Sequence, residues 1–129
     1  MNRITCKTFR ATITIGLFKG YTQEVISWNI LKNEITSIQN KIKTKFDIVL
    51  SAKLYACEII CLGQEEPSVS IEFIQYPKFI TEEKLLKNAI IEFTEEIQNA
   101  LEQNRVVIVF EDETIMIEKT SSIDPKIKM

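Results

Sequence analysis

The sequence predicts an α+β domain in which one antiparallel β-sheet carries two helices on one of its faces. Segments with apolar residues at every second position alternate with two long segments that carry apolar residues every three to four positions. Their order is β-α-β-β-α-β plus a short last strand, which is the split βαβ arrangement. The 129 residues fit one domain, and 45% hydrophobic with 26% charged residues is typical of a packed chain. We expect a domain over residues 1–118 and a flexible tail over 119–129.

The first strand and helix have clear periodicities. Residues 8–18 alternate strictly, with apolar side chains from Phe9 to Leu17 on one face. A helix follows, for which Thr22 and Ser27 are both possible N-caps because a hydroxyl can accept from a free N–H group. Its buried stripe is predicted to consist of Leu31, Ile35, Ile38, Ile42 and Phe46.

The segment 47–62 predicts a strand region whose alternation is interrupted. One face runs from Ile48 to Ala56 and then reaches Glu58, an acid among apolar positions. A β-bulge near Ala56 would switch the two faces, and a strand covered on both sides would also explain the pattern. Residues 63–67 predict a hairpin loop from their turn-forming residues.

The second half repeats the strand and helix patterns. Residues 68–76 alternate again, and Pro77 ends that strand. Thr81 is the expected cap of the second helix, whose buried stripe runs from Leu86 to Leu101. Residues 106–110 form a continuous apolar strand, and 114–118 are expected to return as an edge strand.

This order of elements resembles small ferredoxin-like α+β proteins, including uncharacterised bacterial families. The residues that carry the resemblance run from Arg10 and Gly16 through Ser27 and Trp28 to Val107. The resemblance covers most of the chain and implies the ferredoxin-like fold. It implies no particular activity.

The candidate binding site lies on the sheet face that the helices leave uncovered. Strand parity places a mixed charged, polar and aromatic set of side chains on this face. The residues that we expect to bind a ligand are Arg10, Thr12, Lys53, Tyr55 and Glu72. The alternative is an ordinary polar face on which Arg10 and Glu72 form an ion pair.

The composition excludes several kinds of chemistry. The chain has no histidine, which rules out Ser-His-Asp and Cys-His catalysis and histidine metal sites. Cys57 and Cys61 are about 13 Å apart if they lie on a strand, too far to share one metal ion, and with Cys6 they are expected to be reduced thiols. Gly16 and Gly20 lack the rest of a phosphate-binding motif. We therefore expect no metal and no cofactor.

The sequence predicts a cytoplasmic protein. Its apolar stretches, such as residues 106–110, are far shorter than the roughly 20 residues that a membrane span needs. The N-terminus lacks the apolar core of a signal peptide. Heavy use of isoleucine, lysine and asparagine is typical of an AT-rich bacterial or phage genome.

These observations favour a non-catalytic, homo-oligomeric binding protein whose open sheet face or subunit interface takes a small anionic molecule or a protein partner. One alternative is a small enzyme of the isomerase or lyase type with Glu58 or Glu72 as its base. Another is a phage-type protein that sequesters a signalling nucleotide. RNA binding is disfavoured, because Tyr55 alone offers a stacking platform on this face and the chain carries a net charge of −2.

Overall fold

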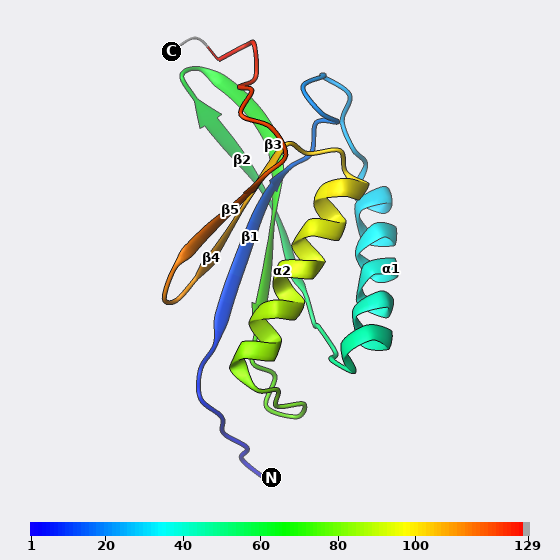
Figure 1. The fold of residues 1–129 in the computed structure, drawn as a ribbon, viewed down its shortest axis with the longest axis vertical. Coiled ribbons are helices and arrows are strands. Elements are labelled where there is room, and N and C mark those ends of the chain that lie inside the picture. Colours follow the sequence, from blue (N-terminus) through cyan, green and yellow to red (C-terminus); the bar gives the residue numbers. More distant parts are fainter. Residues whose placement is uncertain (128–129) are drawn as a thin grey trace.

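Five strands form one antiparallel sheet, and both helices lie on the same face of it (Figure 1). The computed structural model describes residues 1–127. Its elements are β1 (Arg10–Gly16), α1 (Trp28–Phe46), β2 (Lys53–Cys61), β3 (Gln64–Ile74), α2 (Glu83–Ala100), β4 (Arg105–Phe110) and β5 (Thr114–Glu118). The strand order across the sheet is β2-β3-β1-β4-β5. The predicted α+β class is confirmed, and the arrangement is consistent with a ferredoxin-like fold.

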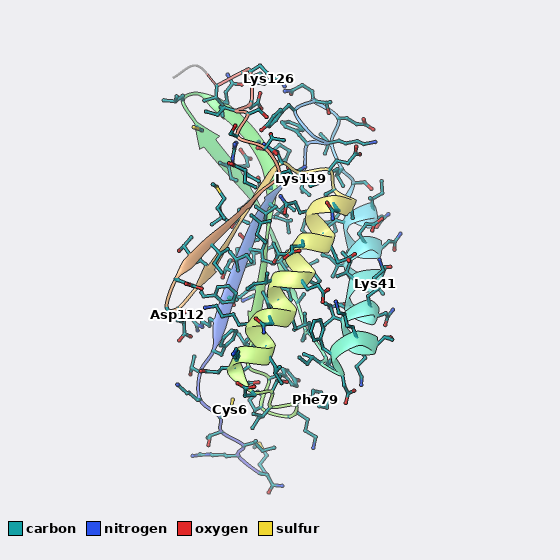
Figure 2. All side chains as sticks on the ribbon, in the orientation of Figure 1. Cys6, Lys41, Phe79, Asp112, Lys119 and Lys126 are labelled. Atoms are coloured by element: carbon teal, nitrogen blue, oxygen red, sulfur yellow. The ribbon has the colours of Figure 1, made fainter. Side chains whose placement is uncertain are left out.

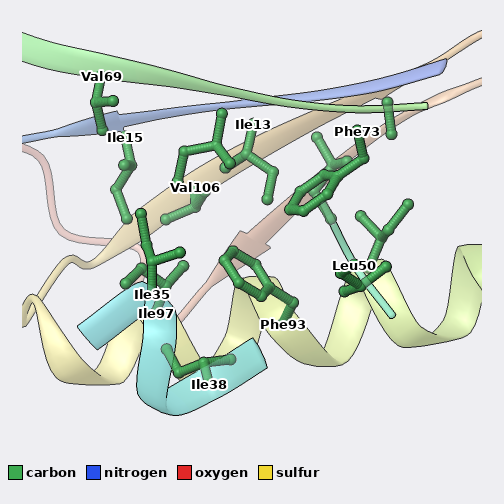
Figure 3. Close-up of a cluster of buried hydrophobic side chains, with 14 of the residues drawn as sticks. Ile13, Ile15, Ile35, Ile38, Leu50, Val69, Phe73, Phe93, Ile97 and Val106 are labelled. Atoms are coloured by element: carbon green, nitrogen blue, oxygen red, sulfur yellow. The ribbon is translucent and has the colours of Figure 1, made fainter. Parts of the chain in front are cut away.

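The core lies between the sheet and the two helices. Alternate residues of β1, β3 and β4 face the helices and are almost fully buried, as the sequence periodicity predicted. Phe73 of β3 meets Phe93 of α2 edge to face, with ring centroids 5.0 Å apart (Figure 3). The helix stripes supply the opposite wall, with Leu31, Ile35, Ile38 and Ile42 from α1 and Leu86, Ile90, Phe93 and Ile97 from α2.

The two helices begin in different ways. Ser27 caps α1, because its hydroxyl accepts a hydrogen bond from the backbone N–H of Ile30 at 3.2 Å. The prediction that Thr81 caps α2 was wrong: Glu82 is the N-cap residue and makes no side-chain cap bond. The backbone of Thr81 is instead bound by Gln75, whose carboxamide accepts from its N–H at 2.9 Å and donates to its carbonyl at 2.7 Å.

The β2–β3 hairpin corrects three sequence interpretations. The strand begins at Lys53 rather than at residue 47, and the turn consists of Leu62 and Gly63, both with positive φ. Residues 64–67, which were expected to form a loop, belong to β3. Pairing is continuous from Lys53↔Glu72 to Cys61↔Gln64, so there is no bulge at Ala56.

Glu58 is exposed for a different reason. Its side chain is on the same face of β2 as the residues that face the helices. The β2–β3 hairpin extends past the ends of the helices, however, so neither helix covers this part of the strand (Figure 1). Ile60 and Leu62 are exposed on the same arm. The alternation in the sequence is interrupted because the hairpin continues beyond the helices, and the side chains of β2 keep the same alternation between the two faces.

The end of the chain after β5 turns back toward the β1–α1 loop. Lys119 donates its backbone N–H to the carbonyl of Asn104 at 2.9 Å, and Tyr21 donates its hydroxyl to the carbonyl of Ser122 at 3.0 Å. Residues 128–129 of the predicted tail lie outside the described part. Within residues 1–127, no helix is long and apolar enough to cross a membrane.

Candidate functional site

The structure places the five predicted site residues on one face, which is the face away from the helices. The register aligns Lys53, Glu72 and Thr12 in one row across three strands, and Tyr55 lies in the next row. Arg10 is opposite Ile74. Within residues 1–127 these five side chains form no ion pair or hydrogen bond with one another, so the Arg10–Glu72 ion pair of the alternative interpretation is not formed. Their role in binding stays a prediction.

A hollow of about 280 Å³ lies on this same face, toward the end where the hairpin extends past β1. Its volume is close to the lower end of the roughly 300–1,000 Å³ of small-molecule pockets. None of the five predicted residues lines it. We call it the open-face hollow, and its lining comes from four parts of the chain: Thr14, Gly16, Phe18, Gly20, Tyr21, Thr22, Ile59, Glu66, Gln103, Asn104, Arg105, Val107, Ile123, Asp124 and Ile127.

Glu66 is the most chemically distinctive residue in the hollow. It belongs to β3, opposite Ile59 of β2, and its side chain is half-buried on the open face. A Cβ atom placed on Gly16 would lie 1.9 Å from its Oε1 atom. The missing side chain of Gly16 therefore makes the space that the Glu66 carboxylate occupies.

Burial raises the pKa of Glu66 above its ordinary value, and the negative charge of Asp124 raises it further. A hydrogen bond from the backbone N–H of Phe18 and the charge of Lys126 act in the opposite direction and are smaller. A carboxylate with a raised pKa in a hollow is typical of a general base or of a group that receives a cation.

The side chains that line the hollow include more acidic than basic residues. Glu66 and Asp124 are its acidic residues, and Arg105 is its basic residue. The guanidinium of Arg105 is already paired, since its Nε lies 2.7 Å from a carboxylate oxygen of Glu118. The hollow is therefore better suited to a cationic ligand than to the anionic one expected from the sequence.

A larger groove of about 480 Å³ runs between α1 and α2. Its charged residues are matched across the groove, where Lys41 binds Glu96 and Lys45 binds Glu92. These pairs join the two helices and leave little unpaired charge for a ligand. The open-face hollow is the better candidate.

Sequence reasoning missed Glu66 because it assigned residues 63–67 to a loop. Two signals were present in the sequence. Extending the alternation of β3 backward from Glu72 and Ser70 places Glu66 on the open face. Gly16 also interrupts the outward face of β1, and a glycine inside a strand often marks a place where another group approaches closely.

The three cysteines are not part of a metal-ligating cluster among the described residues. Cys6, Cys57 and Cys61 are free thiols, and among the described residues there is no group of three potential metal-ligating side chains. Cys57 lies near the hydroxyl of Ser70, with 3.7 Å between Sγ and Oγ.

Comparison with known proteins finds similar folds among solved structures. No protein-family model matches the chain, and no curated protein matches it either. Two solved structures of a phage SAM lyase are similar. The structure in complex with S-methyl-5′-thioadenosine has a TM-score of 0.65 and 17% identity, and the apo structure has a TM-score of 0.67 and 16% identity. Both comparisons cover 95% of this chain and 98% of the other, and at this identity they show a shared fold.

Proposed function

We propose that this protein is a small lyase that binds S-adenosylmethionine (SAM) in the open-face hollow and cleaves it to S-methyl-5′-thioadenosine. The observation that carries the proposal is the half-buried carboxylate of Glu66 in a hollow with more acidic than basic residues. The shared fold with a phage SAM lyase supports it. Among the hypotheses drawn from the sequence, the proposal favours the small enzyme without histidine. Glu66, rather than Glu58 or Glu72, then acts as its base.

The lining of the hollow supports an adenosyl ligand. The rings of Phe18 and Tyr21 offer surfaces on which an adenine base can stack. Thr14 provides a hydroxyl group for the ribose. The positive sulfonium would meet the carboxylates of Glu66 and Asp124, as Coulomb attraction favours.

The proposed reaction needs no histidine. When the bond between the sulfonium sulfur and the γ-carbon of the aminobutyrate group breaks, sulfur keeps the electron pair and leaves as a neutral thioether. No acid is required to protonate this leaving group. The γ-carbon is either attacked by the substrate's own carboxylate, which closes a lactone, or becomes part of a double bond when a base removes the β-proton.

Glu66 has a role in both routes. It holds the cationic part of the substrate in either case, and in the elimination route it also accepts the β-proton. Its raised pKa increases its strength as a base. The second product, homoserine lactone or vinylglycine, identifies the route.

The test is incubation of the purified chain with SAM, followed by mass spectrometry of the products. We expect S-methyl-5′-thioadenosine to accumulate, and Glu66→Gln to slow its formation by about 100-fold or more, the size of a lost acid–base group. Glu58→Gln is the matched control, because Glu58 is exposed on the opposite face of the same hairpin. Its rate should be that of the wild type.

Two results would contradict the proposal. If SAM neither binds nor reacts, the hollow is not an adenosyl site. If SAM binds with micromolar affinity but remains intact, the nucleotide-sequestering alternative replaces the lyase.

We also propose that copies of the chain associate through the open sheet face. Four apolar residues of this face are between 42% and 53% exposed: Tyr55, Ile74, Val109 and Met116. Exposed apolar area of this kind is often covered by a second sheet. Light scattering should show an oligomer that Val109→Asp dissociates. Leu85→Asp, at an exposed position of α2, should leave the mass unchanged. A monomeric wild type would refute the association.

A further inference from the structure

The segment after β5 consists of two parts that are held differently. Its first part, residues 120–122, is fixed by side chains of the sheet end. Asn104 donates to the carbonyls of Thr120 and Ser122 at 3.2 and 3.3 Å and accepts from the Thr120 N–H at 2.9 Å. Arg105 donates to the carbonyl of Ser122 at 2.7 Å. These bonds make residues 120–122 a fixed base.

The second part, residues 123–127, lacks such anchors. Its hydrogen bonds within the described part of the chain are internal: Lys126 and Ile127 donate their backbone N–H groups to the side chain and the carbonyl of Asp124, each at 2.9 Å. Ile123, Asp124 and Ile127 nevertheless line the open-face hollow. One wall of the hollow is thus a compact turn that is joined to the fold at its base. Such a turn can move as a unit, with Ser122 as the hinge.

The free wall carries a charge that a ligand can use. Asp124 belongs to this wall and lines the same hollow as Glu66, which belongs to the sheet. Lys126 of the same wall acts on the pKa of Glu66 in the opposite direction, but its effect is smaller than that of Asp124 and it does not line the hollow. Two like charges on opposite sides of an empty hollow repel each other, whereas a cation between them attracts both. The position of the wall should therefore respond to the charge of the ligand.

We propose that residues 123–127 form a strap that closes over a cationic substrate, and that Asp124 determines specificity by favouring a sulfonium over a neutral thioether. The strap rests on the proposed lyase function. Cleavage turns the sulfonium into a neutral thioether, so the attraction that closes the strap is lost when the product forms. The strap would then open and release S-methyl-5′-thioadenosine.

The test compares two uncleaved analogues that differ in charge at the sulfur position. Sinefungin carries a protonated amine there, and S-adenosylhomocysteine carries a neutral thioether. Calorimetric titration of the full chain should give tighter binding of sinefungin. Asp124→Asn should reduce this preference by about threefold to tenfold, which is the size expected for one partly solvated charge pair. The reduction should come mainly from a lower affinity for sinefungin.

Two further variants serve as controls. Asp124→Glu keeps the charge and should keep most of the preference. Asp112→Asn makes the same chemical change in the β4–β5 turn, far from Lys126 in Figure 2, and should leave it unchanged. Hydrogen exchange should also show that sinefungin protects residues 123–127 more than S-adenosylhomocysteine does.

The outcomes separate the strap from the lyase. If both analogues bind and Asp124→Asn leaves their affinity ratio unchanged, the strap proposal is overturned and the lyase proposal stands. If neither analogue binds to the wild type, both proposals fail. Equal protection of residues 123–127 by the two analogues would also overturn the strap.

Discussion

Substitution of Gly16 by alanine tests how the fold positions Glu66. The added Cβ would lie 1.9 Å from Oε1 and 2.6 Å from Cδ of Glu66, so the carboxylate has to turn away. Gly16 is not one of the positive-φ glycines of the chain, and its backbone accepts alanine without strain. The effect of the substitution therefore comes from the displaced carboxylate.

The magnitude follows from the contacts of Glu66. The added methyl group occupies the space of the carboxylate, and overpacking of this kind costs about 1–2 kcal/mol at a partly open site. Replacing glycine by alanine in a strand returns roughly 0.5–1 kcal/mol. We expect Gly16→Ala to destabilise the wild type by about 0.5–1 kcal/mol. In a Glu66→Ala background the methyl group meets no carboxylate, and the same substitution should stabilise the chain by about 0.5–1 kcal/mol.

A double-mutant cycle measures this difference. Urea unfolding of the wild type, the two single variants and the double variant should give a coupling free energy of about 1–2 kcal/mol between Gly16 and Glu66. A coupling below about 0.5 kcal/mol, which is the usual error of additivity, would refute the close contact. In the SAM assay Gly16→Ala should resemble Glu66→Gln.

Two other predictions concern the pH dependence of stability and the core. The pKa of Glu66 is raised from its ordinary value of 4.5. Between about pH 4.5 and the raised pKa, the folded chain therefore keeps a proton that the unfolded chain has already lost. The free energy of unfolding falls as the pH rises through this range. Glu66→Gln removes this loss. Urea unfolding should show that the unfolding free energy of the variant, relative to that of the wild type, is larger at pH 7 than at pH 4. An equal difference at the two pH values would contradict the raised pKa. Phe93→Ala should cost about 3–5 kcal/mol of unfolding free energy because Phe93 is fully buried against Phe73, whereas Leu85→Ala on the exposed side of α2 should cost less than about 0.5 kcal/mol.

The sequence was sufficient to predict the layers and the direction of most side chains. Period-two alternation in residues 8–18 and 68–76 correctly placed Ile13, Ile71 and Phe73 in the core. The helix stripes were predictable for the same reason, because one side of each helix must be buried against the sheet. These features depend on local periodicity, which a single sequence contains.

The interrupted pattern of β2 could not be resolved in the same way. Its alternation changes at Glu58 because the helices end before the hairpin does, and the relative length of elements far apart in the chain is not encoded in local periodicity. The two-residue turn at Leu62 and Gly63 was also hidden, since leucine rarely adopts a positive φ. Once residues 64–67 had been assigned to a loop, Glu66 was lost as a candidate.

The site depends on the unequal lengths of neighbouring strands. The seven residues of β1 end at Gly16, whereas β3 has eleven residues and continues past this point to Glu66 and the turn. Where β1 stops, β3 loses a neighbour on one side, and the space is bounded instead by the loop that contains Phe18 and Tyr21. A carboxylate at this step is shielded enough for its pKa to rise, yet it still lines an open hollow. The same residue in the middle of the sheet would have strands on both sides, and at the tip of the hairpin it would be fully solvated.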